Sequence, residues 1–128
     1  MKKKYKAVIS TINFGAFHGH AMACIGTNVD EVLLKQKDKG WRLYLEQVKE
    51  EGFNCDFVHE AKMRDGNVYS CIFVSKKDSD EWYIKVAHEC FHLCQILAMN
   101  YHIDMSQEKE SMAYHHSYLM RQMLELAK

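Results

Sequence analysis

The stretch "FNCDFVHEAKMRDGNVYSCIFVSK", residues 53–76, holds two β-like runs on either side of one turn signal. The runs "FNCDFVHEA" and "NVYSCIFVSK" are rich in aromatic and β-branched residues, which favour strands. Between them, Asp65-Gly66 is a residue pair that tight hairpin turns prefer. The sequence therefore predicts a β-hairpin in the middle of the chain.

Two further strands are expected near the start of the chain. The segment "KYKAVISTI", residues 4–12, is rich in β-branched residues and is followed by Asn13 and Gly15, which predicts a strand that ends in a turn. The glycine-containing segment after it predicts a loop and then a short strand over residues 21–25.

Helices are expected on both sides of the hairpin. Residues 29–51 are rich in Leu, Lys, Gln and Glu, with Gly40 as a candidate break and Gly52 as the C-terminal cap. Asp78 and Ser79 are candidate N-caps of a helix that runs to about residue 100, and Ser106 is the candidate N-cap of a last helix. This order predicts an α+β fold in which a small antiparallel sheet packs against helices, two of them at the C-terminus.

Composition limits the class of protein. The 128 residues are 48% hydrophobic, which suits one compact domain over residues 1–128. Lys plus Arg and Asp plus Glu number 17 each, so no overall charge favours nucleic acid or an anionic membrane as a partner. No apolar stretch approaches the roughly 20 residues of a membrane span, and the apolar run near the start is too short for a signal peptide. Five cysteines without a CxxC pair predict reduced thiols, as in a cytoplasmic protein.

The segment "VAHECFHLCQIL", residues 86–97, contains the HExxH pattern of His88, Glu89 and His92. On a helix the two histidines are separated by about 6 Å along the axis and by roughly 40° around it, so both can reach one metal ion. Glu89 lies about 60° around the helix from His92, where it can act as a general base on metal-activated water. The pattern predicts a zinc site, although an amphipathic helix can carry these three residues on its solvated face by chance.

The rest of this helix divides into two faces. A helical wheel gathers its apolar residues on one side as a predicted core face: Trp82, Val86, Cys90, Phe91, Leu93, Cys94 and Leu97. The histidines and Glu89 fall in the remaining arc together with Glu81, Lys85 and Gln95. The cysteines therefore belong to the predicted core and not to the metal site.

A third zinc ligand is expected from the last helix, "SQEKESMAYHHSYLMRQMLELA", residues 106–127. Glu110 lies opposite the methionine-rich core face, and antiparallel packing of the last two helices would bring it toward the histidine pair. Glu110 can also be a first-turn acid that the helix dipole favours. Glu108 projects nearer the core. His115, expected to be exposed, or His116, expected to be buried with a hydrogen-bond partner, would replace Glu110 if the helices crossed differently.

"VAHECFHLCQIL" followed by "ESMAY" resembles a pattern in small phage-encoded proteins that have a zincin-like metallopeptidase core. The order HExxH and then Glu is also similar to that of the larger gluzincin metallopeptidases. The resemblance covers the chain from about Asp80 to about Tyr118. It implies a single zincin-like domain with zinc ligands at His88, His92 and Glu110, Glu89 as the catalytic base and Tyr114 near the site, where its hydroxyl could stabilise an oxyanion.

Three functional hypotheses follow. The first is a zinc-dependent hydrolase, most simply a peptidase, whose peptide or protein substrate adds as a strand to an edge formed by residues 67–76. The second is a non-catalytic zinc-binding regulatory or interaction protein, such as a phage protein that acts on a host protein partner. The third is a metal-free helical interaction domain. His18 and His20 could form a further metal-binding or lid segment, or could be ordinary solvated loop residues.

Overall fold

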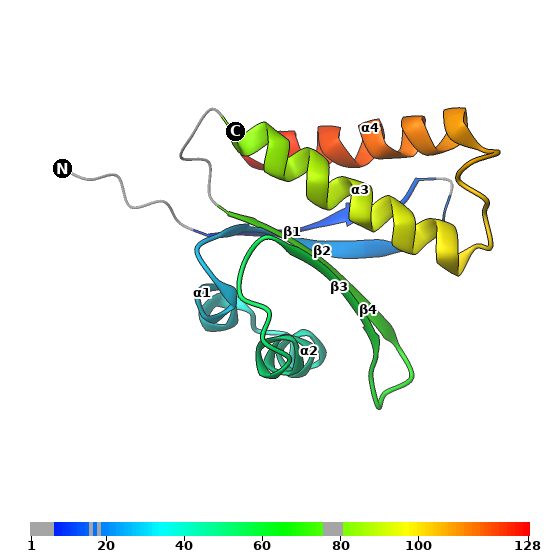
Figure 1. Ribbon diagram of the computed structural model, residues 1–128. Helices are drawn as coiled ribbons and strands as arrows, with labels where there is room; N and C mark the ends of the chain where they lie inside the picture. Colours follow the sequence, from blue (N-terminus) through cyan, green and yellow to red (C-terminus); the bar gives the residue numbers. More distant parts are fainter. Residues whose placement is uncertain (1–6, 16, 18, 76–80) are drawn as a thin grey trace.

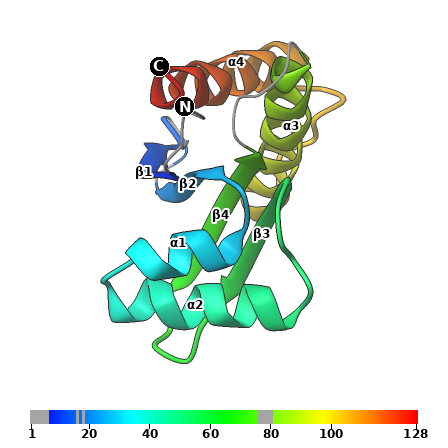
Figure 2. The same ribbon diagram turned by 90° about the vertical axis from the view of Figure 1, so that its left-hand side faces the viewer.

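The computed structural model describes residues 7–15, 17, 19–75 and 81–128, which form one four-stranded sheet and four helices. In chain order the elements are β1 (Val8–Asn13), β2 (His20–Gly26), α1 (Val29–Lys35), α2 (Lys39–Glu50), β3 (Phe57–Lys62), β4 (Val68–Ser75), α3 (Trp82–Asn100) and α4 (Lys109–Leu126). Helices α1 and α2 cover one face of the sheet, and α3 and α4 cover the other (Figures 1 and 2). The prediction of an α+β fold is confirmed.

The sheet is mixed, with the strand order β1-β2-β4-β3. The β1–β2 and β3–β4 pairs are antiparallel, and the second pair is the predicted hairpin. Strands β2 and β4 are parallel, with Met22 opposite Cys71, so the prediction of an antiparallel sheet is wrong at this contact. The reason is the long crossover through α1 and α2, which a parallel strand pair requires. It returns the chain so that β4, the second strand of the hairpin, enters beside β2 in the same direction.

The two central strands are buried on both faces. The side chains that contact the layer of α3 and α4 are Ala21, Ala23, Ile25, Ile72 and Val74. Those that contact the layer of α1 and α2 are Met22, Cys24, Cys71 and Phe73. Both strands are therefore apolar over nearly their whole length, as expected where helices cover both faces of parallel strands.

The first helical region is divided in two, as predicted, but the break lies before Gly40. Helix α1 ends at Lys35, and Asp38 caps α2 by accepting a hydrogen bond from the Trp41 amide (3.0 Å). Gly40 lies instead in the first turn of α2, where an added Cβ would collide with the Tyr69 hydroxyl. Gly52 follows α2 with φ +93°, the left-handed conformation of a helix C-terminus, as predicted.

A chain of hydrogen-bonding groups fixes β3 to α2. The buried Tyr44 hydroxyl of α2 donates to the His59 carbonyl oxygen (3.0 Å) and lies 2.8 Å from His59 Nδ1. His59 Nε2 lies 2.5 Å from a Glu51 carboxylate oxygen at the end of α2. Because His59 is itself on β3, these contacts hold the outer strand of the hairpin against the helix layer.

Of the N-caps predicted for α3 and α4, only that of α4 falls among the described residues. The predicted N-caps of α3, Asp78 and Ser79, lie outside the described residues. Ser106 does not cap α4, because it belongs to the preceding turn and donates both its amide and its hydroxyl to Asp104 Oδ1. Although α3 is 19 residues long, no helix in the described part of the chain is apolar enough over sufficient length to cross a membrane.

The packing of α2 can be tested with two leucines on that helix. Leu45 is fully buried, whereas Leu43 is 60% exposed. We expect Leu45→Ala to lower the free energy of unfolding by about 2–5 kcal/mol, because it opens a cavity in the core. The matched change Leu43→Ala should alter it by less than about 0.5 kcal/mol. Urea unfolding followed by circular dichroism measures both, and equal losses would contradict this orientation of α2.

Candidate metal centre

Three side chains of α3 meet near the middle of the helix. His88, Glu89 and His92 offer ligand atoms that all lie within 4.8 Å of one another. The two histidine Nε2 atoms are 3.0 Å apart. In tetrahedral zinc coordination two such nitrogens lie about 3.3 Å apart, given Zn–N distances of about 2.0–2.1 Å. Only a small separation of the two rings would therefore be needed for both histidines to hold one ion.

The three residues border an open cavity of about 530 Å³ between α3 and the chain leading into β3. Among the other residues around it are Phe53, Asp56, Val58, Gln95, Ile96 and Met99. Most of these side chains are apolar, and the polar ones lie beside the histidines. The cluster therefore faces an outer strand of the sheet and is accessible from outside.

Glu89 is the buried member of the cluster. Its side chain is 4% exposed, although the sequence placed it on the polar arc of the helix. Residues at the start of β3 lie on this side of α3 and border the same cavity as Glu89, so this arc of the helix does not simply face solvent. Burial raises the pKa of the Glu89 carboxyl; positive charge on His88 and His92 would oppose the rise, and the nearby Asp56 adds to it. A carboxyl group of raised pKa beside two imidazole rings is suited to accepting and releasing a proton.

The two histidines have different hydrogen-bond partners. His92 Nδ1 lies 3.0 Å from the side-chain oxygen of Gln95, three residues later on α3. Within the described residues, the contact with His92 Nε2 is the one hydrogen bond that His88 makes through its ring. Gln95 thus holds the ring of His92, and His92 in turn holds the ring of His88.

Polar contacts between α3 and β3 flank the cavity. At one end, Lys85 Nζ lies 3.9 Å from Asp56, which also accepts a hydrogen bond from the Ser75 amide (2.8 Å). At the other end, the side-chain amide Nδ2 of Asn100 donates to both carboxylate oxygens of Glu60 (3.1 and 2.9 Å). The helix is therefore linked to the hairpin on both sides of the cluster.

Sequence reasoning did not single out Asp56 or Gln95. Gln95 was placed on the histidine side of the helix, and its spacing of three residues from His92 was a usable signal. Asp56 has φ +53°, an uncommon conformation for a residue other than glycine. Its position beside α3 depends on how the hairpin docks, which no local pattern reveals.

The other two predicted site residues lie on α4, away from the cluster. Glu110 is exposed in the first turn of α4, and Tyr114 is 75% exposed one turn later. Neither belongs to the His88, Glu89 and His92 group or borders its cavity, as far as the described residues go. Their roles as ligand and catalytic residue stay predictions.

The position of α4 explains this separation. The two helices pack together as predicted, but α4 packs on the side of α3 that carries Ala87, Phe91 and Cys94. At 100° per residue these three positions lie about 240–300° around the helix from His88. Figure 2 shows α4 above β1 and β2, whereas α3 lies above β4 and β3. The cluster and α4 therefore occupy different sides of α3.

The structure places three of the four other histidines that the sequence raised as candidates. His116 is half-buried and donates its Nε2–H to the Ala87 carbonyl oxygen (3.0 Å), which confirms the prediction of a hydrogen-bond partner. The prediction that His115 is exposed is wrong: its ring lies against Phe17, its Nδ1 is buried without a described partner, and burial lowers its pKa. His20 is exposed at the start of β2, and His18 lies outside the described residues.

The predicted core face of α3 is confirmed at every position except Phe91. The buried residues are Trp82, Val86, Cys90, Leu93, Cys94 and Leu97. Phe91 is 48% exposed, because α4 covers only part of its ring. All five cysteines are free thiols, and burial raises the pKa of Cys90 to about 12 and that of Cys94 to about 11. Cys90 and Cys94 belong to the core, as predicted.

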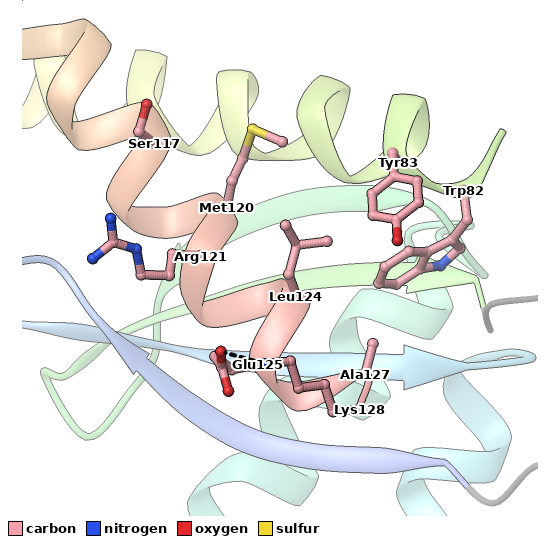
Figure 3. A pocket seen from close by; sticks show the side chains of 9 residues that line it. All are labelled: Trp82, Tyr83, Ser117, Met120, Arg121, Leu124, Glu125, Ala127 and Lys128. Atoms are coloured by element: carbon pink, nitrogen blue, oxygen red, sulfur yellow. Dashed lines mark hydrogen bonds and ion pairs between the residues drawn. The ribbon is translucent and has the colours of Figure 1, made fainter. Parts of the chain in front are cut away.

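A second open cavity, of about 560 Å³, lies between the start of α3 and the end of α4 (Figure 3). Its walls are formed chiefly by Trp82, Tyr83, Met120 and Leu124, with Arg121 at the border (Figure 3). Lys128 and Glu125 form an ion pair beside it (2.9 Å). None of the predicted site residues lines this cavity, whereas His88, Glu89 and His92 line the cavity beside β3.

Comparisons with family models, with curated proteins and with solved structures found no match to this chain.

The burial of Glu89 has a consequence for the stability of the metal-free protein. When folding raises the pKa of an acidic group, the protein loses stability as the pH rises from the ordinary pKa of that group, here 4.5, through its folded-state pKa. We expect Glu89→Gln to remove this loss and to raise the melting temperature at neutral pH. A gain of about 1 kcal/mol in the free energy of unfolding would raise the melting temperature by roughly 3–6 °C.

The matched change Glu46→Gln alters an exposed glutamate on α2 and should leave the melting temperature unchanged. Thermal unfolding in the presence of a chelator, at acidic and at neutral pH, measures both variants. An unchanged or lower melting temperature of Glu89→Gln at neutral pH would contradict an unfavourable buried charge.

Proposed function

We propose that His88 and His92 bind a zinc ion beside β3 and that the protein is a zinc-dependent hydrolase. The observation that carries this proposal is the 3.0 Å separation of the two Nε2 atoms, with the buried Glu89 carboxyl in the same group. Imidazole nitrogens are common zinc ligands, and a nearby carboxylate that need not bind the ion is what a hydrolytic centre requires.

Zinc at this position would polarise a substrate carbonyl and make bound water more acidic. The residues of the chain would divide the remaining work. His88 and His92 hold the ion through Nε2. Glu89 accepts a proton from the attacking water and returns it to the leaving group. Its burial next to the histidines keeps this carboxyl close to the reacting water and away from bulk solvent.

A peptide is the substrate class that the surroundings favour. Strand β4 cannot accept an added strand as the sequence suggested, because β2 and β3 already occupy both of its sides. Strand β3 pairs with β4 alone in the described part of the chain, and it borders the cavity. An extended peptide could pair with β3 and place a backbone carbonyl near the histidines. Phe53, Ile96 and Met99 would offer apolar contacts to its side chains.

The metal and the reaction can be tested separately. We expect about one zinc ion per chain by elemental analysis of the wild type, and loss of that zinc in His88→Ala and His92→Ala. Glu89→Gln should keep the zinc and lose hydrolysis by a factor of about 10²–10⁴, the usual contribution of a general base. Cleavage is measured by mass spectrometry on a mixture of peptides, with Glu46→Gln as the matched control.

Cleavage that persists in Glu89→Gln would contradict the mechanism. Stoichiometric zinc without cleavage of any peptide, together with a lower melting temperature after chelation, would instead support a non-catalytic zinc-binding protein. A wild-type protein that retains no zinc would contradict both.

The role of Glu110 is a separate question. Because Glu110 lies outside the histidine group, we expect Glu110→Gln to bind zinc as tightly as the matched variant Glu108→Gln. Competition with a fluorescent zinc chelator measures both affinities. A loss of tenfold or more in Glu110→Gln alone would assign Glu110 as the third ligand and would require α4 to approach the histidines when zinc binds.

A further inference from the structure

The side chain of Gln95 contacts His92, and the role inferred for it rests on the proposed zinc site. The Gln95 side-chain oxygen lies 3.0 Å from His92 Nδ1. An amide oxygen can only accept a hydrogen bond, so this contact requires the His92 proton to be on Nδ1. In the neutral ring Nε2 then has no proton, and its lone pair is available.

The contact between the histidines follows from this assignment. With Nε2 of His92 as an acceptor, the atom 3.0 Å away, His88 Nε2, must carry the proton that it donates. The metal-free site thus contains a directed chain: His88 Nε2–H donates to His92 Nε2, and His92 Nδ1–H donates to Gln95. Zinc would replace the single proton between the two Nε2 atoms. His88 would then hold its proton on Nδ1, so no net proton is lost when both rings are neutral.

Gln95 is well placed for this role. It is half-buried and lies three residues after His92 on the same helix, so the geometry of α3 sets their separation. It borders the same cavity as the cluster. In the described part of the chain His88 makes no corresponding contact through Nδ1. The two histidines are therefore not equivalent: the metal-binding nitrogen of His92 has no proton before metal binds, whereas His88 has to change its tautomer.

We propose that Gln95 is a positioning residue of the zinc site, which holds His92 as the Nδ1–H tautomer before metal binds. Partners of this kind orient metal-binding histidines in general, and their removal weakens metal affinity by about 10–100-fold. The effect should reach zinc binding through His92, because Gln95 itself is not required to touch the ion.

The test uses two substitutions at position 95. Gln95→Met keeps the length of the side chain and removes the acceptor, whereas Gln95→Glu keeps an acceptor. In the metal-free full-length chain, ¹⁵N correlation spectra of the histidine rings at mildly alkaline pH should show the Nδ1–H tautomer of His92 in the wild type and in Gln95→Glu. In Gln95→Met, His92 should shift toward the Nε2–H tautomer. Zinc affinity, measured with zinc alone in competition with a chelator, should fall by about 10–100-fold only in Gln95→Met.

Gln47→Met on α2 is the matched control and should change neither measurement. The inference is overturned if wild-type His92 carries its proton on Nε2, or if Gln95→Met leaves the tautomer and the zinc affinity unchanged. If either of these outcomes is found while the wild type still binds zinc, the proposed function stands and only the role of Gln95 is overturned. Failure of every protein to bind zinc would remove the proposed function and with it the role of Gln95 in metal binding.

Discussion

The parallel contact between β2 and β4 is the constraint on which the rest of the molecule depends. It places β4 in the interior of the sheet and leaves β3 at the outside. Because the chain leaves β4 at the sheet centre, α3 crosses back over β4 and β3 and brings its middle next to the start of β3 (Figure 1). The histidines thus face an outer strand because of a pairing made by residues that have no part in the site.

Local signals predicted the elements of the fold, and tertiary contacts decided how they are arranged. Asp65-Gly66 was sufficient to predict the hairpin, and Gly66 has the positive φ that such a turn needs. Gly40 misled the prediction of a helix break, since its role is to let α2 approach Tyr69. The parallel pairing depends on which strand of the hairpin enters beside β2, and the pattern of apolar residues is compatible with either.

The candidate site was predictable to the extent that it lies on one helix. The spacing of His88, Glu89 and His92 brings their side chains close together on any helix, whatever the rest of the fold, and the structure shows them together. A partner from another element could not be predicted in the same way. Glu110 was chosen from the wheel of α4, but the side of α3 on which α4 packs is set by the sheet beneath both helices. The same holds for the residues at the start of β3 that border the cavity beside Glu89, because the docking of the hairpin places them there.

The outer position of β3 also concerns encounters between two copies of the chain. An open strand edge that admits an extended peptide is equally open to the same edge of another molecule, and this is how many sheet proteins begin to aggregate. Here the strand has only six residues, and it carries Glu60 and Lys62 in its second half. A short edge strand with charged side chains disfavours pairing with the same strand of another molecule. The length and the charged residues of β3 therefore make this open edge a less favourable one for pairing between copies of the chain.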